Sequence, residues 1–125
     1  RLTSSAPLNA TTWEWATQGL STAFPIAFNN QTSGRKVEIG VVARLAQAKP
    51  TDAISVVYAT QQAGNSGWKR FPLTPEFELR KFIFDVPVLD PGPYVKEPIV
   101  VIHADAAGGG RAAEILGVYV KQVTP

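Results

Sequence analysis

The amino-acid sequence predicts an all-β domain, an antiparallel two-sheet β-sandwich of the jelly-roll type with about eight strands. Two observations predict this fold. Short runs rich in Val, Ile and aromatic residues recur along the chain, and ten glycines and ten prolines divide them into pieces of strand length. Helix-forming stretches are few, and one of the two that occur is interrupted by glycines at positions 108–110.

The expected strands are each bounded by turn residues and follow in chain order: 12–17, 22–29, 36–47, 53–61, 69–73, 77–86, 99–104 and 113–123. The strand 36–47 alternates most clearly between apolar residues and others. Its core face is predicted to carry Val37, Ile39, Val41, Ala43 and Leu45.

Three strands carry further local signals. The apolar residues of 77–86 change faces between Leu79 and Phe82, which predicts a β-bulge near residues 80–81. Pro25 has no backbone N–H, so the strand 22–29 is expected at a sheet edge. The strand 113–123 is apolar on both faces, which predicts a central position in its sheet. One of those faces is expected to carry Leu116, Val118 and Val120.

The chain length of 125 residues fits one domain. Residues 1–11 are small and polar, and we expect them to form an N-terminal extension to a single β-sandwich domain at 12–125. Because the chain opens without an initiator Met, we interpret it as a mature or excised domain of an extracellular or secreted protein, with the cell surface as a further location.

Charge and composition exclude several classes of protein. The 12 Lys and Arg residues are scattered and form no basic stripe, so no nucleic-acid partner is expected. No run of about 18 apolar residues occurs, so no membrane span is expected. The absence of cysteine excludes disulfides and thiolate metal sites.

Aromatic residues are the first candidates for a binding site. Trp13 and Trp15 are two positions apart and share one face of their strand, where they form either core or an outward strip able to stack on a sugar ring. Trp68 ends the polar loop 64–67 and lies two residues before Arg70. Its ring is either a stacking platform for a sugar, surrounded by hydrogen-bonding groups, or a plug over the open end of the sandwich.

Polar residues that support catalysis or metal binding are sparse. His103, the sole histidine, excludes a multi-histidine metal site, and no nucleophile accompanies it and Asp105. We interpret His103 as a residue satisfied at a strand end, with the rim of a pocket as the alternative. Asp105 and nearby carbonyls offer a few oxygen ligands for calcium but lack the Asp-rich spacing of a calcium loop. We therefore predict no enzyme, no metal ligand and no cofactor, with a structural calcium ion as the alternative.

The order of motifs in the second half of the chain resembles a known group. Gly-Asn-Ser-Gly-Trp at 64–68 is followed by Phe-Pro-Leu-Thr-Pro-Glu-Phe at 71–77, Phe-Ile-Phe-Asp-Val at 82–86 and a closing Gly-Arg-Ala-Ala-Glu-Ile-Leu-Gly-Val-Tyr-Val at 110–120. This order resembles the galactose-binding-domain-like jelly rolls, which include many carbohydrate-binding modules. The resemblance covers residues 37–123.

This resemblance implies a non-catalytic module that binds a polysaccharide or glycan, often as part of a larger secreted protein. In the present sequence it implies that Trp68 stacks on the sugar. It also implies that Asn65, Arg70 and Arg44 supply hydrogen bonds to the ligand.

A second class of function is a structural subunit, such as a capsid, fibre or filament jelly roll that forms homo-oligomers. The two-sided apolar strand at 113–123 and the proline-rich segment 87–98 suit an interface, although such a segment is also typical of a crossover loop. A third reading, a small enzyme, depends only on His103 and scattered carboxylates. Exposure of Trp68 beside a groove favours the module, and a large apolar patch favours the structural subunit.

Overall fold

The protein is described by a computed structural model that covers residues 2–3, 20–61, 64–89, 96–104 and 109–123. In chain order its elements are β1 (Leu2–Thr3), β2 (Leu20–Ala23), α1 (Ile26–Thr32), β3 (Lys36–Leu45), β4 (Ala53–Ala59), β5 (Lys69–Pro72), β6 (Glu78–Asp85), β7 (Ile99–His103) and β8 (Ala112–Gln122). From residue 36 onward the expected strands match β3 to β8 to within two residues at each end. The expected strand at 12–17 lies outside the described residues.

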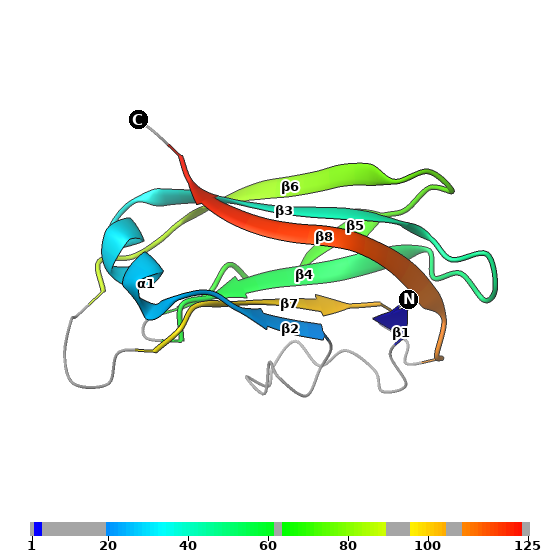
Figure 1. The fold of residues 1–125 in the computed structure, drawn as a ribbon, viewed down its shortest axis with the longest axis horizontal. Helices are drawn as coiled ribbons and strands as arrows, with labels where there is room; N and C mark the ends of the chain where they lie inside the picture. Colours follow the sequence, from blue (N-terminus) through cyan, green and yellow to red (C-terminus); the bar gives the residue numbers. More distant parts are fainter. Residues whose placement is uncertain (1, 4–19, 62–63, 90–95, 105–108, 124–125) are drawn as a thin grey trace.

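The described strands form two antiparallel four-stranded sheets that pack face to face, which confirms the predicted β-sandwich (Figure 1). We call them sheet A, with the order β1-β8-β3-β6, and sheet B, with the order β2-β7-β4-β5. Successive strands change sheet at every connection except the one between β4 and β5. This winding is that of a jelly roll. The strand β8 lies between β1 and β3, although β1 pairs only with Ala112 and Ala113.

The expected strand at 22–29 is wrong beyond Ala23, where β2 ends and α1 follows. Pro25 precedes the helix, and its carbonyl accepts a hydrogen bond from the backbone N–H of Phe28 at 2.9 Å. Proline suits a helix start because the first backbone N–H groups have no intrahelical partner. Among the described strands β2 is at the edge of sheet B, as expected, but Pro25 lies outside it and is not the reason.

Asn29 anchors α1 to the end of the sandwich. Its side chain is fully buried, and Nδ2 donates to the carbonyl of Thr60 at 2.9 Å and to the carbonyl of Lys96 at 2.8 Å. Phe24 and Phe28, which flank the start of the helix, pack against the core. Tertiary contacts therefore hold this seven-residue helix, which is too short to be stable alone.

The main core lies between the two sheets and includes the inward face of β3. Val37, Ile39, Val41 and Ala43 are almost fully buried there, as predicted, and Leu45 packs against them half-buried. A second cluster consists of Val57, Ala59, Ile99 and Val101. Because successive strand residues point to opposite faces, this cluster covers the face of sheet B that points away from sheet A.

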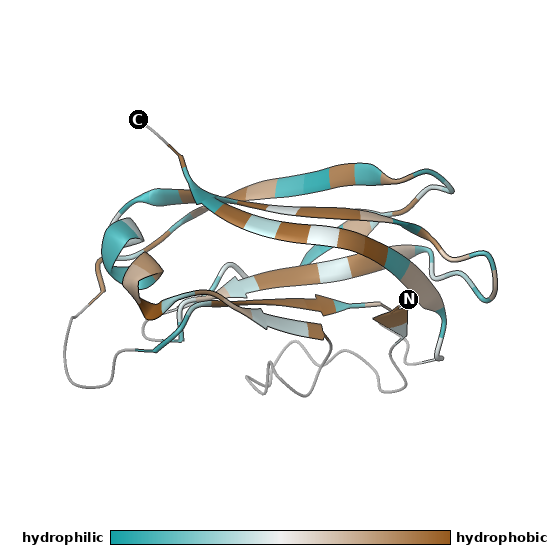
Figure 2. Ribbon diagram, in the orientation of Figure 1, coloured by the Kyte–Doolittle hydropathy of each residue, from teal (hydrophilic) through white to brown (hydrophobic). Residues whose placement is uncertain are grey.

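The two sheets therefore differ in burial. Every residue of β4 and β7 is buried. Along β6, exposed residues alternate with half-buried ones after Glu78. The hydropathy of β8 also alternates, whereas β7 is hydrophobic through most of its length (Figure 2). The two central strands of sheet B are therefore enclosed on both faces, whereas sheet A has one face toward solvent.

The bulge predicted near residues 80–81 is wrong. The strand β6 pairs with β3 without interruption, and Leu79 simply lies on the outer face, where it is 44% exposed. The irregularity occurs instead in β8, where Val42 pairs with Gly117 and Ala43 pairs with Ile115. Leu116 is the extra residue, and it is 68% exposed. The expected grouping of Leu116 with the inward residues of β8 is therefore wrong, because the bulge turns Ile115 inward instead.

Candidate functional site

Trp68 lies half-buried on the outer face of sheet B. Its ring packs against the cluster of Val57, Ala59, Ile99 and Val101, and its indole nitrogen is buried. A ring that covers apolar strand residues contributes to folding, and only part of it stays available to a ligand. This position is neither the plug over the open end of the sandwich nor a fully open platform.

The loop before Trp68 uses its polar groups internally. The Ser66 hydroxyl accepts a hydrogen bond from the backbone N–H of Tyr58 and donates one to the carbonyl of Gly67, both at 2.9 Å. The side-chain oxygen of Asn65 accepts a 2.8 Å hydrogen bond from the backbone N–H of Gly67. Gly67 has a φ of 71°, a conformation that glycine adopts without strain. Asn65, predicted to contact a glycan, thus shapes this turn.

Arg70 and His103 lie in one cross-strand row of sheet B, on either side of Ser55. Arg70 is exposed at the sheet edge, whereas Ser55 is 7% exposed and His103 only 2%. The burial of His103 agrees with its interpretation as a structural strand residue. A side chain so deeply buried does not form the rim of an open pocket.

Arg44 lies on the other sheet, near the end of β3. Its guanidinium forms a 2.5 Å ion pair with Glu114 of β8 and lies 4.2 Å from the centre of the Phe77 ring. The predicted ligand-binding residues are therefore divided between the two sheets. Trp15 and Asp105 lie outside the described residues, and within the described ranges no group of three or more His, Asp or Glu side chains is arranged to hold a metal ion.

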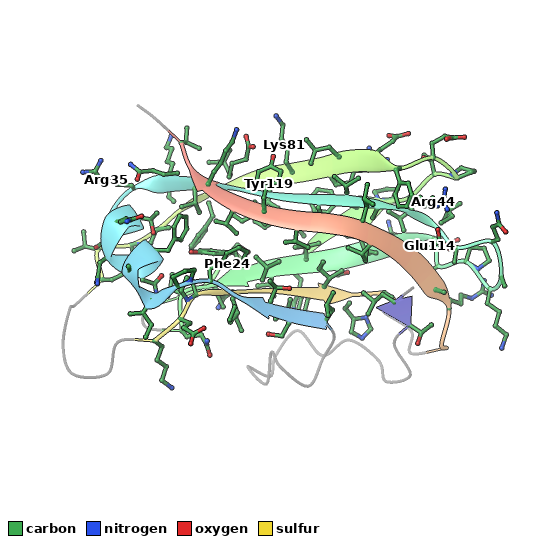
Figure 3. The ribbon with its side chains drawn as sticks, viewed as in Figure 1. Phe24, Arg35, Arg44, Lys81, Glu114 and Tyr119 are labelled. Carbon is green, nitrogen blue, oxygen red and sulfur yellow. The ribbon has the colours of Figure 1, made fainter. Side chains whose placement is uncertain are left out.

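The surface that sequence reasoning missed is the solvent-facing side of sheet A, which we call the sheet A outer face. Glu38 lies at its centre with a side chain only 13% exposed. The Tyr119 hydroxyl donates a 2.6 Å hydrogen bond to Glu38 Oε2, and the ammonium groups of Lys121 and Lys81 approach the carboxylate at 3.5 and 3.8 Å. Figure 3 shows Tyr119 and Lys81 together on this face.

These contacts shift the protonation of both partners. The hydrogen bond from Tyr119 lowers the pKa of Glu38, and the two lysines lower it further against the opposing effect of burial. The same hydrogen bond raises the pKa of Tyr119. At neutral pH the centre of the face therefore holds one carboxylate between two cations.

Ile83 lies beside this polar centre, and further large apolar side chains are exposed toward the other end of sheet A. The exposed fractions are 44% for Leu79, 51% for Ile83, 68% for Leu116 and 37% for Phe77. Leu79 and Ile83 share the outer face because they pair with Val42 and Glu38 of β3. Two signals in the sequence point to this face. They are the glycine at position 40 inside a β-branched strand and the apolar residues at both alternating positions of 77–86.

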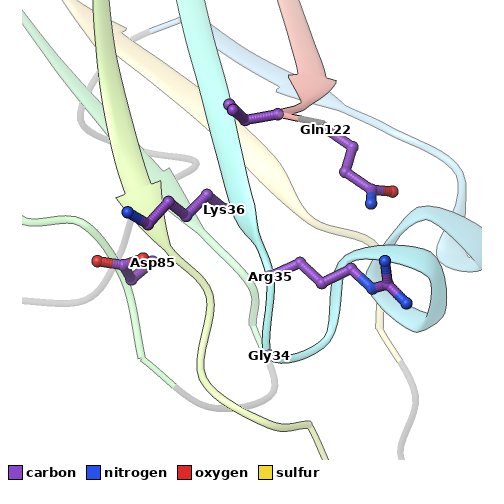
Figure 4. A pocket seen from close by; sticks show the side chains of 6 residues that line it. Gly34, Arg35, Lys36, Asp85 and Gln122 are labelled. Atoms are coloured by element: carbon purple, nitrogen blue, oxygen red, sulfur yellow. The ribbon is translucent and has the colours of Figure 1, made fainter. Parts of the chain in front are cut away.

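A groove of about 490 Å³ opens at the end of sheet A (Figure 4). It is lined by Gly34, Arg35, Lys36, Asp85, Gln122 and Val123. Lys36 and Asp85 are cross-strand partners, so charges of both signs lie side by side. This lining contains no aromatic platform and does not define a ligand class.

Comparison of the chain with protein-family models, with curated proteins and with solved structures finds no match. The resemblance to galactose-binding-domain-like modules therefore stays a prediction. In the described residues no helix has the length and hydrophobicity to cross a membrane.

Proposed function

We propose that this chain is a non-catalytic structural subunit, a jelly-roll domain that assembles with further copies of itself. The observation that carries the proposal is the exposure of large apolar side chains on the sheet A outer face. Leu79, Ile83 and Leu116 stand out from a regular sheet whose opposite face forms the core. Large apolar side chains exposed on one face of a sheet are typical of surfaces that contact another protein.

Burial of this face against a partner is energetically favourable. Complete burial of a Leu or Ile side chain contributes about 1.5–3 kcal/mol of free energy. Because these side chains are about half exposed, burying the rest of each one against a partner would contribute roughly half of that free energy. The backbone of this face is already ordered, because β3 pairs with both β6 and β8 along its length. Binding of a partner therefore costs little additional conformational entropy of the backbone. Its alternation of apolar groups with charged ones suits reversible contact between folded copies.

The fold is compatible with this function and does not by itself select it. Jelly rolls include both capsid and lectin domains, so the site must decide between them. The residues predicted to bind a glycan supply little support for a lectin-like role. Trp68 covers an apolar cluster, Asn65 holds a turn, and Arg44 is paired with Glu114 on the other sheet.

Light scattering coupled to size exclusion, over a range of protein concentrations, tests the proposal. We expect oligomers whose mass rises with concentration. The substitutions Leu79→Asp and Leu116→Asp should each lower the mass of these oligomers. Val88→Asp is the matched control, because Val88 is 83% exposed and lies outside this face. A wild-type chain that stays monomeric at every concentration contradicts the proposal.

A carbohydrate-binding module is the second candidate, and the incomplete burial of Trp68 next to the exposed edge residue Arg70 favours it. In that case the chain binds a polysaccharide or glycan as part of a larger secreted protein. A broad glycan array separates the two candidates. Binding by a monomer, lost in the Arg70→Ala variant, would support the module and displace the structural subunit.

A further inference from the structure

The strand β6 forms an open edge of sheet A. It is the terminal strand of that sheet, and in the described residues only β3 pairs with it. It is eight residues long and unbroken by a bulge. Leu79, Lys81, Ile83 and Asp85 are all exposed along it. A long, regular edge strand is a template for pairing with another chain unless the protein protects it.

The direction of its backbone groups follows from the hydrogen bonds at its end. The backbone N–H of Val86 donates to the carbonyl of Arg35 at 2.9 Å, so even-numbered residues in this stretch point their backbone groups at β3. The odd-numbered residues point theirs at the open edge. At Lys81, Ile83 and Asp85 the backbone N–H and C=O groups thus point at the open edge, and the side chains lie on the sheet A outer face.

We propose that two copies of the chain join through β6, antiparallel and in a single register, with Ile83 of each copy at the twofold axis. This inference rests on the proposed self-association and specifies one of its contacts. It makes the two copies of sheet A into one continuous sheet.

The side chains of β6 exclude the other symmetric registers. A twofold axis sets the central residue opposite its own copy. Centring on any charged residue of β6 therefore places like charges directly opposite each other, which destabilises a strand pair. Centring on either phenylalanine places Asp85 opposite an apolar side chain. Centring on Leu79 leaves the second half of β6 unpaired.

Centring on Ile83 produces complementary pairs throughout the stretch from Lys81 to Asp85. Lys81 of each copy lies opposite Asp85 of the other, so opposite charges flank the axis twice. Ile83 meets its own copy between them, and Phe82 lies opposite Phe84 on the inner face. About six backbone hydrogen bonds form between the odd-numbered residues. The ladder ends at Pro87, which has no backbone N–H.

The charged residues of β6 then have a specific role. A lysine in an edge strand normally prevents pairing with other chains. Here Asp85 lies four residues after Lys81 and neutralises it in one antiparallel register only. Lys81 and Asp85 thus favour one register of the β6 pair and disfavour registers shifted along the strand. Charge patterns select among strand registers in this way.

Single cysteine variants test the register, since the chain has no native cysteine. Directly opposed residues of a bonded antiparallel pair have Cα atoms about 5.5 Å apart, within the range for a disulfide. Ile83→Cys should therefore form a disulfide-linked dimer on mild oxidation. Lys81→Cys and Leu79→Cys are matched controls on the same edge. At about 3.4 Å per residue their thiols are separated from their own copies by about 14 and 27 Å and should not join.

The outcomes separate this inference from the proposed function. Preferential linkage of Ile83→Cys over both controls supports the register. An oligomer by light scattering in which Ile83→Cys links no better than the controls overturns the β6 contact and leaves the structural-subunit proposal standing. A monomer at all concentrations overturns both.

A charge exchange gives an independent measurement. Lys81→Asp and Asp85→Lys should each weaken dimerisation about tenfold, because each sets like charges opposite one another twice. The double variant restores opposite charges and should recover most of the loss. A double variant as weak as the single ones contradicts the pairing. The melting temperature of each variant checks that the fold is intact.

Discussion

The ring of Tyr119 lies directly over Gly40, its cross-strand neighbour in sheet A. A Cβ atom at position 40 would lie 2.2 Å from Cε1 of Tyr119, a separation that two carbon atoms do not adopt. Glycine is therefore required here by the ring and not by a special backbone angle. An aromatic residue that covers a strand glycine compensates for its missing side chain. In this protein it also brings the Tyr119 hydroxyl to Glu38.

The substitution Gly40→Ala should destabilise the fold by about 1–3 kcal/mol, because the added methyl must displace the ring of Tyr119. Gly117→Ala is the matched control. A Cβ there would have no atom within 4 Å, so its effect should be small. Urea unfolding of the two variants measures the difference. Equal stability of the two would mean that Tyr119 moves aside at no cost.

The pair of Glu38 and Tyr119 predicts a pH dependence of stability. The lowered pKa of Glu38 means that its contribution is present above the ordinary value of 4.5 and is lost as the pH falls through the lowered pKa. The raised pKa of Tyr119 means that its contribution is present below the ordinary value of 10.0 and is lost as the pH rises through the raised pKa. The pair therefore stabilises the fold between these limits.

Tyr119→Phe isolates this effect, because the ring over Gly40 is kept and only the hydroxyl is lost. We expect the pKa of Glu38 to rise toward its ordinary value, which a carboxyl NMR titration measures. The acid side of the stability profile should move to higher pH. An unchanged Glu38 titration would assign the lowered pKa to the lysines instead.

Asn29→Ala should destabilise the fold by about 2–3 kcal/mol. The change removes two donated hydrogen bonds and leaves the carbonyls of Thr60 and Lys96 without this donor. The adjacent Asn30 is exposed, and Asn30→Ala should change stability by no more than about 0.5 kcal/mol. Thermal unfolding of both variants compares them. Similar melting temperatures would show that α1 is held without Asn29.

Trp68→Ala should lower stability by about 2–4 kcal/mol, because the ring packs against strand residues that are almost fully buried. Denaturant unfolding measures the loss. A variant that keeps its stability and loses binding on a glycan array would favour the carbohydrate-binding module over the structural subunit.

Much of the sandwich was predictable because its strands alternate. The inward set from Val37 to Ala43 follows from period-two spacing alone. The helix α1 was missed because Phe24, Ile26 and Phe28 also alternate, and because Asn29 holds the helix through Thr60 and Lys96, residues distant in the chain. The exposed Leu79 was mistaken for half of a bulge, since sequence does not distinguish a strand that bulges from one that leaves a leucine in solvent.

The candidate site depended even more on long-range pairing. Glu38 and Tyr119 are 81 positions apart, and Arg44 and Glu114 are 70 positions apart. Their contacts follow from the order of β6, β3 and β8 in sheet A, which local patterns do not determine. The loop residues around Trp68 were predicted as ligand contacts because their side chains can form hydrogen bonds. In the structure, Asn65 and Ser66 form hydrogen bonds that hold the loop itself.

The enclosure of β4 and β7 on both faces has a consequence for how the domain opens. Amide protons in these strands reach solvent only when the whole fold is lost, so their exchange with deuterium should report the global free energy of unfolding. The amides of β6 face water along one side and should exchange through small local fluctuations. The slowest-exchanging amides are thus expected in β4 and β7 of sheet B, and those of β6 in sheet A should exchange well before the domain unfolds.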